Sequence, residues 1–300
     1  MVRVVLRLLV AVLTAVAGSV SAQQVGPANG ALVLVGGNLQ DGAIVERFLE
    51  LAGGPDAPIV LVPTAGGAES YDQTWRGGDA FRAAGATRLT VLHTTDRDTA
   101  NTAGFVEPLR RARGVWFGGG RQWRLADAYL RTRVHEELRG VLARGGVVGG
   151  SSAGATILGS YLVRGDTRTN TIMMGDHEEG FGFLRDVGID QHLLRRNRQF
   201  DLLEVVRARP GLLGIGIDED TAIVVRGDAF EVIGQSYVAI YDHERQLDSG
   251  GLFYFLSPGD TYDLATREAF RPEPARRPLQ RVVTGSWPAA GSRRAGQQGR

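Results

Sequence analysis

Short apolar runs alternate with longer amphipathic segments through the first half of the chain. Five such runs are bounded by glycine or proline or by charged residues, and they lie at residues 31–35, 58–63, 89–93, 114–117 and 146–149. The helix-like stretches between them lie at residues 43–52, 102–113, 121–131 and 133–144. Strands that are apolar on both faces and separated by helices are typical of a parallel sheet covered on both sides. The pattern predicts a three-layer αβα fold with a mostly parallel sheet.

From about residue 210 the pattern changes to short strands separated by tight turns. We expect these strands at residues 213–217, 222–225, 230–233 and 237–241. They predict a β-rich C-terminal portion with a partly antiparallel sheet. Because no linker or internal repeat separates the two halves, we expect one catalytic domain over residues 23–270.

The first 22 residues have the composition of a secretory signal peptide. Arg3 and Arg7 precede an apolar run, and Val20-Ser21-Ala22 supplies small residues for cleavage. That run is shorter than the ~20 apolar residues that span a bilayer. We expect cleavage after Ala22, no membrane association afterwards, and a bacterial protein that is periplasmic or secreted. An uncleaved anchor or a buried first helix is the alternative.

The chain contains no cysteine and no lysine, and its 34 basic residues are all arginine. These absences exclude thiolate nucleophiles, disulfides, Cys-based zinc sites, Schiff-base chemistry and Ser–Lys dyads. Residues 271–300 carry seven arginines against one acid, so the body of the chain is mildly acidic. An acidic body argues against nucleic acid as a partner. We expect the basic end, residues 271–300, to be a disordered tail, with binding to an acidic polymer as the alternative.

A predicted strand runs directly into Gly150-Ser151-Ser152-Ala153-Gly154, and a helix is expected to follow. In the G-x-S-x-G pattern a serine projects from a tight turn, and the next backbone N–H can stabilise an oxyanion. The spacing selects Ser152 over Ser151 as the nucleophile. The alternative is that this turn is an ordinary serine cap of a helix.

A nucleophilic serine needs a base, and the chain offers five histidines: His93, His135, His177, His192 and His243. The charged neighbours of His135 and His243 indicate exposed positions, and His93 ends a predicted strand. His177 could ligate a metal, but no further ligand stands at a suitable spacing. None of these four is favoured as the base.

His192 is the favoured base because three arginines follow it within six residues, at positions 195, 196 and 198. Nearby positive charge disfavours the imidazolium form and keeps the ring available to accept a proton. The third member should be a carboxylate that orients the imidazole. Asp218, Glu219 and Asp220 all follow an apolar run, and their chemistry does not choose among them.

Four motifs together resemble the cyanophycinase and aspartyl dipeptidase (dipeptidase E) family of serine peptidases, over about residues 30–242. The motifs occur in the family's order, and they are Gly119-Gly120-Arg121-Gln122, Gly150-Ser151-Ser152-Ala153-Gly154-Ala155, Asp190-Gln191-His192 with Arg196 and Arg198, and Gly214-Ile215-Gly216-Ile217-Asp218-Glu219. The resemblance implies a fold related to class I glutamine amidotransferases. It also implies an enzyme that needs no metal or organic cofactor, and a homodimer.

The resemblance further implies a catalytic triad of Ser152, His192 and Glu219, acting through an acyl-enzyme. The implied oxyanion donors are the amides of Gly120 and Ala153. The residues implied to line the substrate pocket are Gln122, Ser151, Asp190, Gln191, Arg196 and Arg198. The implied substrate is a peptide with aspartyl linkages, above all cyanophycin, the β-linked Asp–Arg polymer, from which an exopeptidase releases β-Asp-Arg.

Two positions depart from the family's pattern. Arg121 stands where cyanophycinases usually have an acid, and Asp201 stands where they have a third arginine. Losing a bidentate arginine clamp changes binding by about 1.5–3 kcal/mol, so both departures affect the choice of substrate. Two other functions remain as alternatives: an esterase of the α/β-hydrolase type, and a non-catalytic binding protein on the amidotransferase scaffold.

Overall fold

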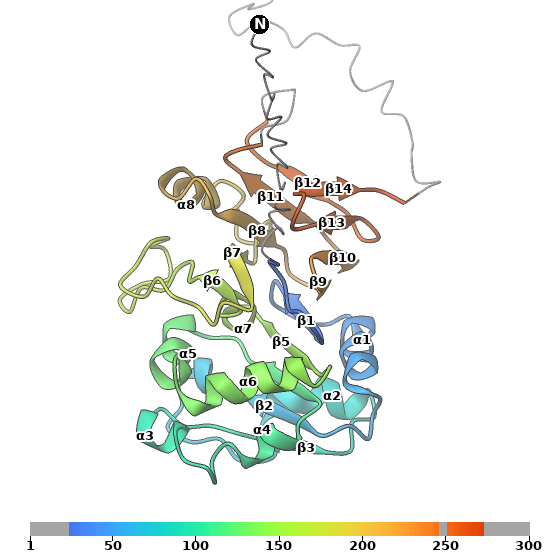
Figure 1. Cartoon of the computed structure of the whole chain (residues 1–300), viewed down its shortest axis with the longest axis vertical. Coiled ribbons are helices and arrows are strands. Elements are labelled where there is room, and N and C mark those ends of the chain that lie inside the picture. The colour runs from blue at the N-terminus through green and yellow to red at the C-terminus, as the bar shows by residue number, and fades with distance from the viewer. Residues whose placement is uncertain (1–23, 246–250, 273–300) are drawn as a thin grey trace, which may run out of the picture.

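The computed structural model describes residues 24–245 and 251–272 (Figure 1). The signal peptide predicted at residues 1–22 lies outside them, as do residues 273–300 of the tail predicted at residues 271–300. At the boundary, Arg271 forms an ion pair with Asp260, at 2.7 Å. Within the described residues no helix combines the length and the apolar character needed to cross a membrane.

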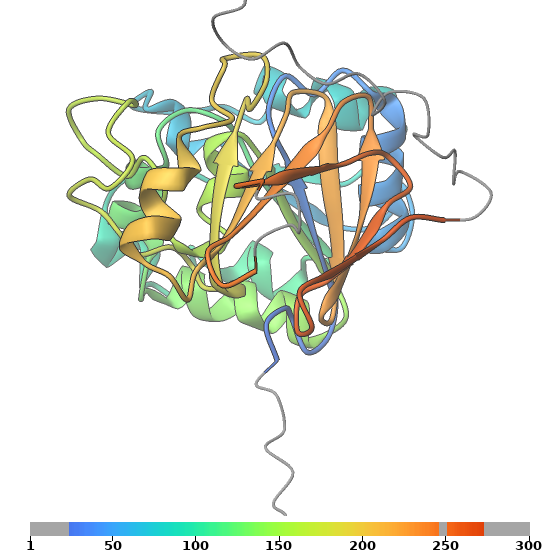
Figure 2. The same cartoon turned by 90° about the horizontal axis from the view of Figure 1, so that it is seen from above.

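The larger sheet has nine strands in the order β14-β13-β10-β9-β1-β5-β4-β2-β3. Five of them are parallel and form one half of the sheet, from β1 in the middle to β3 at the edge: β1 (Ala31–Val35), β2 (Ile59–Val62), β3 (Leu89–Val91), β4 (Gly114–Phe117) and β5 (Val147–Ser151). The other four extend it antiparallel beyond β1: β9 (Thr221–Arg226), β10 (Ala229–Gly234), β13 (Thr261–Asp263) and β14 (Glu268–Phe270). Figure 2 shows these orange and red C-terminal strands lying beside the blue strand β1.

The second sheet has five strands in the order β12-β11-β8-β7-β6. Its bounds are β6 (Gly159–Tyr161), β7 (Leu184–Gln191), β8 (Leu213–Ile217), β11 (Val238–Asp242) and β12 (Tyr254–Leu256). Strands β6, β7 and β8 are parallel, and β11 and β12 are antiparallel to their neighbours. The expected β-rich portion is therefore divided, since β9 and β10 join the larger sheet while β8 and β11 join the second.

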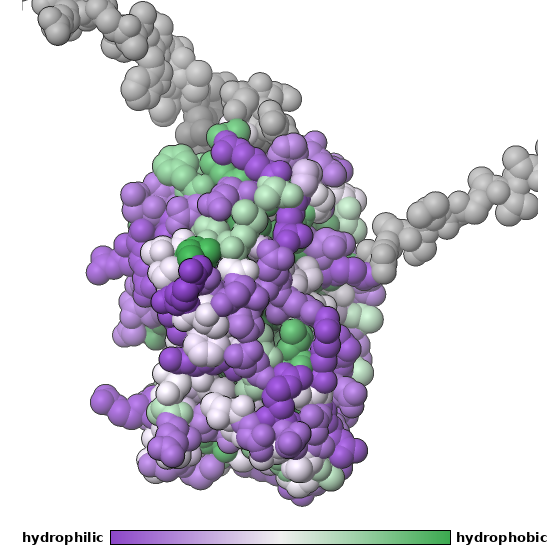
Figure 3. All heavy atoms as spheres, turned by 90° about the vertical axis from the view of Figure 1, so that its left-hand side faces the viewer, coloured by the Kyte–Doolittle hydropathy of each residue, from purple (hydrophilic) through white to green (hydrophobic). Residues whose placement is uncertain are grey.

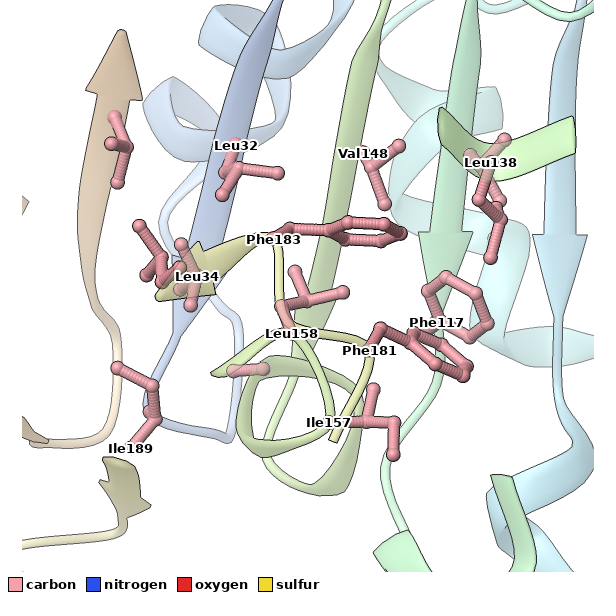
Figure 4. Packing of buried hydrophobic residues seen from close by; sticks show 14 of the residues in the cluster. Leu32, Leu34, Phe117, Leu138, Val148, Ile157, Leu158, Phe181, Phe183 and Ile189 are labelled. Carbon is pink, nitrogen blue, oxygen red and sulfur yellow. The ribbon is translucent and has the colours of Figure 1, made fainter. Parts of the chain in front are cut away.

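Helices cover the sheets on both sides. Their bounds are α1 (Gly42–Ala52), α2 (Asp79–Ala83), α3 (Arg97–Ala100), α4 (Glu107–Arg111), α5 (Gln122–Tyr129), α6 (Arg133–Ala143), α7 (Ala153–Thr156) and α8 (Leu202–Ala208), with the 3-10 turns η1 (Thr64–Gly66) and η2 (Arg76–Gly78). Alternate residues of β1 face opposite cores. Val33 packs with α1 and α2, whereas Leu32 and Leu34 pack with α5, α6 and the second sheet (Figure 4).

The predicted three-layer αβα fold is confirmed, and two of the local differences have a clear physical reason. The helix expected over residues 102–113 is only Glu107–Arg111, because Gly104 precedes it and Pro108, which lacks an N–H, fits only a first turn. Strand β7 was not predicted, since charged residues interrupt its apolar pattern, and one of them, Asp190, is fully buried.

Phe117→Ala tests the packing of the core between the larger sheet and its covering layer. Phe117 is fully buried and its ring centroid lies 5.6 Å from that of Phe181 (Figure 4). We expect the variant to lose about 3–5 kcal/mol of unfolding free energy, because the deleted ring leaves a cavity. Phe270→Ala, at a residue that is 54% exposed on β14, is the matched control and should lose less than about 1 kcal/mol. Urea titration measures both, and equal losses would contradict this account of the core.

Candidate active site

The turn between β5 and α7 holds Ser152 in an unusual backbone conformation, with φ 57° and ψ −116°. Strain of this kind persists only where the surrounding structure enforces it, often at functional sites. The flanking glycines have no room for a side chain. A Cβ on Gly150 would lie 2.4 Å from the carbonyl oxygen of Gly154, and one on Gly154 would lie 2.2 Å from that of Phe117. Packing therefore requires the small residues of the G-x-S-x-G pattern.

Three side chains form a continuous hydrogen-bonded chain at this turn. Ser152 Oγ lies 2.9 Å from His192 Nε2, and His192 Nδ1 lies 2.6 Å from Glu219 Oε1. Ser152 follows a strand of the larger sheet. His192 and Glu219 follow β7 and β8, parallel neighbours in the second sheet. The structure thus brings together the three residues that the motifs indicate, at the carboxyl ends of strands, where α/β folds bind ligands.

Three successive carbonyl groups at the end of β1 hold this arrangement. Each accepts one backbone N–H: Ser152 donates to Val35 at 2.9 Å, His192 to Gly36 at 2.8 Å, and Asp220 to Gly37 at 2.9 Å. One short segment therefore positions the serine, the histidine and the neighbour of the glutamate relative to one another.

The imidazole of His192 lies against Gly37. A Cβ on Gly37 would lie 2.2 Å from the ring's Cε1 atom, and Gly37 has a φ of 130°, which side chains rarely adopt. His192 itself has a φ of 54°. Gly37, the second glycine after β1, therefore makes room for the imidazole ring. The sequence placed this glycine after a strand but did not indicate that role.

The structure separates the three carboxylates whose roles the sequence left open. Glu219 contacts His192, as above. Asp218 instead accepts two backbone N–H groups of the turn after His192, at 2.9 and 3.0 Å. Asp220 accepts the N–H groups of residues 40 and 41, at 2.8 and 2.6 Å. The two aspartates therefore fix loops on either side, and only the glutamate is placed to orient the imidazole.

Burial lowers the pKa of His192 by disfavouring its charged form. The hydrogen bond to Glu219 acts in the opposite direction, and the positive charges of Arg196 and Arg198 lower the pKa further. The net direction agrees with the expectation of a neutral ring, although burial is a larger cause than the arginines.

The two implied oxyanion donors, the N–H groups of Gly120 and Ala153, belong to segments that adjoin Ser152. Within the described residues neither Gly120 nor Ala153 donates its N–H in a hydrogen bond. A Cβ on the preceding residue, Gly119, would lie 3.9 Å from Ser152 Oγ, so this loop is close to the nucleophile. A side chain on Gly120 would collide with the carbonyl oxygen of Ala65, at 2.0 Å. Both amides thus have no acceptor among the described residues, as donors of an oxyanion hole would need.

Three of the residues predicted to line the substrate pocket are almost inaccessible. Gln122, Asp190 and Gln191 are each no more than 2% exposed. Gln122 Nε2 donates to two backbone carbonyls of the loop after β6, at 2.7 and 2.9 Å. These side chains therefore support the walls of the site. Arg196 is exposed and Ser151 is half-buried beside Ser152.

Arg164 is a buried residue of the site that no sequence motif indicated. Its guanidinium is 2% exposed and binds both carboxylate oxygens of Asp190, at 2.8 and 2.9 Å. It also binds Asp201, at 2.5 Å. Arg121, the other unusual position, donates to the carbonyl oxygen of Asp166, also at 2.5 Å. Both departures from the family's pattern thus contact the loop after β6.

The expectation that His135 is exposed is wrong. It is 5% exposed, and Nε2 lies 2.9 Å from the carbonyl oxygen of Phe181. Its charged neighbours along α6 misled the prediction, because they point away from the core while His135 points into it.

The other three histidines lie apart from the triad's hydrogen bonds. His177 contacts Asp176 and Asp127, at 3.0 and 2.7 Å. Elsewhere, His93 Nδ1 lies 2.8 Å from a threonine hydroxyl, and His243 is exposed as expected.

Gly37→Ala tests whether the position of the His192 imidazole depends on the missing side chain of Gly37. The added methyl group would displace the His192 ring, and a shift of about 1 Å in a catalytic group can cost about 100-fold in rate. We expect labelling of Ser152 by a fluorophosphonate to slow by about that factor. Gly42→Ala is the control, because nothing lies within 4 Å of its added Cβ, and it should label at the wild-type rate. Wild-type labelling of Gly37→Ala would contradict the described geometry.

The lowered pKa of His192 predicts the pH dependence of the same labelling reaction. A protonated imidazole cannot accept the proton of Ser152, so the labelling rate should fall only below about pH 6.5. Arg196→Gln removes a positive charge near the ring and raises the pKa of His192. The fall in labelling rate, the acid limb of the pH profile, should therefore move to higher pH. Arg88→Gln, an exposed change before β3, should leave it in place. A limb above pH 7 in the wild type, or no response to Arg196→Gln, would oppose the assignment of His192 as the base.

Comparisons with known proteins agree with the resemblance of the motifs. The sequence profile "Peptidase family S51" matches residues 32–233. A cyanophycinase from Geminocystis herdmanii is 35% identical over 221 residues, covering 70% of this chain and 80% of the relative. One from Synechococcus elongatus is 32% identical over 244 residues, covering 75% of each. A solved peptidase from an acI-B1 Actinobacterium has a TM-score of 0.62 at 25% identity, covering 81% of this chain and 98% of that one. The chain belongs to peptidase family S51 and is a serine-type peptidase.

Proposed function

We propose that this chain is an exported serine exopeptidase that hydrolyses aspartyl peptide bonds, with cyanophycin as its substrate and β-Asp-Arg as its product. The observation that carries the proposal is the unbroken chain from Ser152 through His192 to Glu219, with distances of 2.9 and 2.6 Å. The names of the two cyanobacterial relatives support the choice of polymer. Membership in a peptidase family favours this function over an esterase or a binding protein.

In the first half of the proposed reaction, Ser152 Oγ attacks the scissile carbonyl carbon. Its proton passes to His192 Nε2, which lies within hydrogen-bond distance. The carboxylate of Glu219 holds the Nδ1–H tautomer and stabilises the imidazolium that forms. The N–H groups of Ala153 and Gly120 stabilise the oxyanion. Collapse of this intermediate releases the amine, which takes the proton from His192, and leaves an ester on Ser152.

In the second half, water attacks that ester while His192 again accepts a proton. The carboxylate product leaves and Ser152 regains its hydrogen. A neutral imidazole is needed at the start of both halves, and the lowered pKa of His192 supplies it near neutral pH. Arg196 and Arg198, which lie in the turn after His192, bind the carboxylates of the aspartyl substrate.

Export rests on the composition of the first 22 residues, with Arg3, Arg7, an apolar run and Ala22 at the cleavage point. The polymer is large, so a secreted or periplasmic enzyme would act on material released from other cells. The absence of cysteine is compatible with an oxidising compartment, since no thiol is exposed to it.

Product analysis tests the proposal. Purified protein should release β-Asp-Arg from cyanophycin, with a rate at least about 10⁴-fold lower in Ser152→Ala and His192→Ala. Isomeric Asp–Arg dipeptides and simple esters are the comparison substrates. Mature protein recovered from the exporting host should begin at Gln23. Cleavage of esters alone would show a different hydrolase, and cleavage only of other aspartyl peptides would keep the mechanism and exclude cyanophycin.

A further inference from the structure

A cavity of about 640 Å³ opens beside the turn that carries His192. Its wall includes charged residues of both signs: Arg164, Arg196, Arg198, Asp201, Glu204 and Arg207. Arg196 N–H donates to the carbonyl oxygen of His192 at 3.0 Å, which links the cavity to the triad. Figure 3 views the side of the molecule on which α8 lies in Figure 1, and that surface is mostly hydrophilic. The cavity is therefore suited to a charged ligand.

One part of the wall is suited to a carboxylate. Arg198 is only 8% exposed, and its Nη1 donates to the carbonyl and side-chain oxygens of Gln191, at 3.1 and 2.9 Å. Its other two guanidinium nitrogens make no hydrogen bond within the described residues. Arg196 and Arg207 likewise make no side-chain hydrogen bond there. A fixed, buried arginine with free donors is a strong carboxylate ligand.

Another part of the wall carries carboxylates that the protein pairs only in part. Buried Arg164 bridges Asp190 and Asp201, with two of its hydrogen bonds to Asp190, and Arg198 Nη1 also lies 3.9 Å from Asp190. Asp201 keeps its Oδ1 free, and its side chain is 38% exposed. Glu204 lies one helical turn later on α8 and has no ion pair within the described residues. Residues three apart share a helix face, so these two carboxylates lie together.

We propose that Asp201 and Glu204 form a cation subsite that binds the guanidinium or ammonium group of the substrate, while Arg198 binds its carboxylate. This inference rests on the proposed function and specifies it further: the preferred substrate unit carries both charges, as a β-Asp-Arg unit does. A unit with a neutral or acidic side chain would leave Glu204 and the Oδ1 atom of Asp201 without a cationic partner. Asp201, which replaces an arginine of the family's pattern, thus becomes a specificity-determining residue.

Equilibrium binding to the inactive Ser152→Ala protein tests the subsite without relying on turnover. The ligands are β-Asp-Arg and β-Asp-citrulline, which have the same shape and differ in one positive charge. We expect calorimetry to show the arginine dipeptide binding at least about tenfold more tightly, since charged hydrogen bonds to a carboxylate contribute this much.

Second substitutions in the same protein locate the effect. Glu204→Gln and Asp201→Asn should each reduce the preference to about threefold or less. Glu204→Gln is the cleaner variant, because Asp201 also holds Arg164. Glu46→Gln is the matched control, an exposed glutamate on α1, away from α8 in Figure 1, and it should keep the full preference.

Equal affinity for the two dipeptides, binding of neither, or a preference that survives both substitutions would overturn the subsite. Hydrolysis by the wild-type protein is measured separately, so the two proposals can fail independently. Turnover of aspartyl peptides with equal dipeptide affinities would retain the hydrolase and reject the subsite. A charge preference in binding without turnover of any aspartyl peptide would support the subsite and reject the proposed function.

Discussion

The hydrogen bond from the His192 N–H to the Gly36 carbonyl joins the two sheets at the proposed catalytic site. The adjacent carbonyls of Val35 and Gly37 accept N–H groups from Ser152 and Asp220. Strand β1 lies at the centre of the larger sheet, paired with β5 on one side and β9 on the other. The distances among the three proposed catalytic residues are therefore set by the end of a central strand and the two glycines after it, as a preorganised site requires.

Backbone strain accompanies this arrangement. Ser152 and His192 both have positive φ values, of 57° and 54°. At Gly37 and Gly154, an added Cβ would collide with neighbouring atoms. Strained residues persist when the surrounding packing compensates for them, and here the layers on both faces of β1 are buried. The same packing removes His192 from water and lowers its pKa, so stability of the core and readiness of the base have a common origin.

Much of the fold could be predicted because the central strands are apolar on both faces, and glycines follow β1 and β4. The nucleophile turn was predictable because the G-x-S-x-G pattern consists of consecutive residues. Glu219 could not be separated from Asp218 and Asp220 by chemistry alone, because only the course of the loop decides which carboxylate meets the ring. Arg164 was missed because its partner Asp190 lies 26 residues away, and that pairing is also why a charged segment forms the buried strand β7. His135 was assigned to the surface because its sequence neighbours are charged, although its own direction on α6 is inward.

The most direct test of the account is the identity of the residue that a fluorophosphonate modifies, determined by peptide mass spectrometry. Ser152 and Ser151 are adjacent, yet only Ser152 Oγ lies within hydrogen-bond distance of the imidazole. The account predicts modification at Ser152 in the wild-type protein and its loss in His192→Ala. Modification at Ser151 or another serine, or undiminished modification in His192→Ala, would contradict the assigned triad.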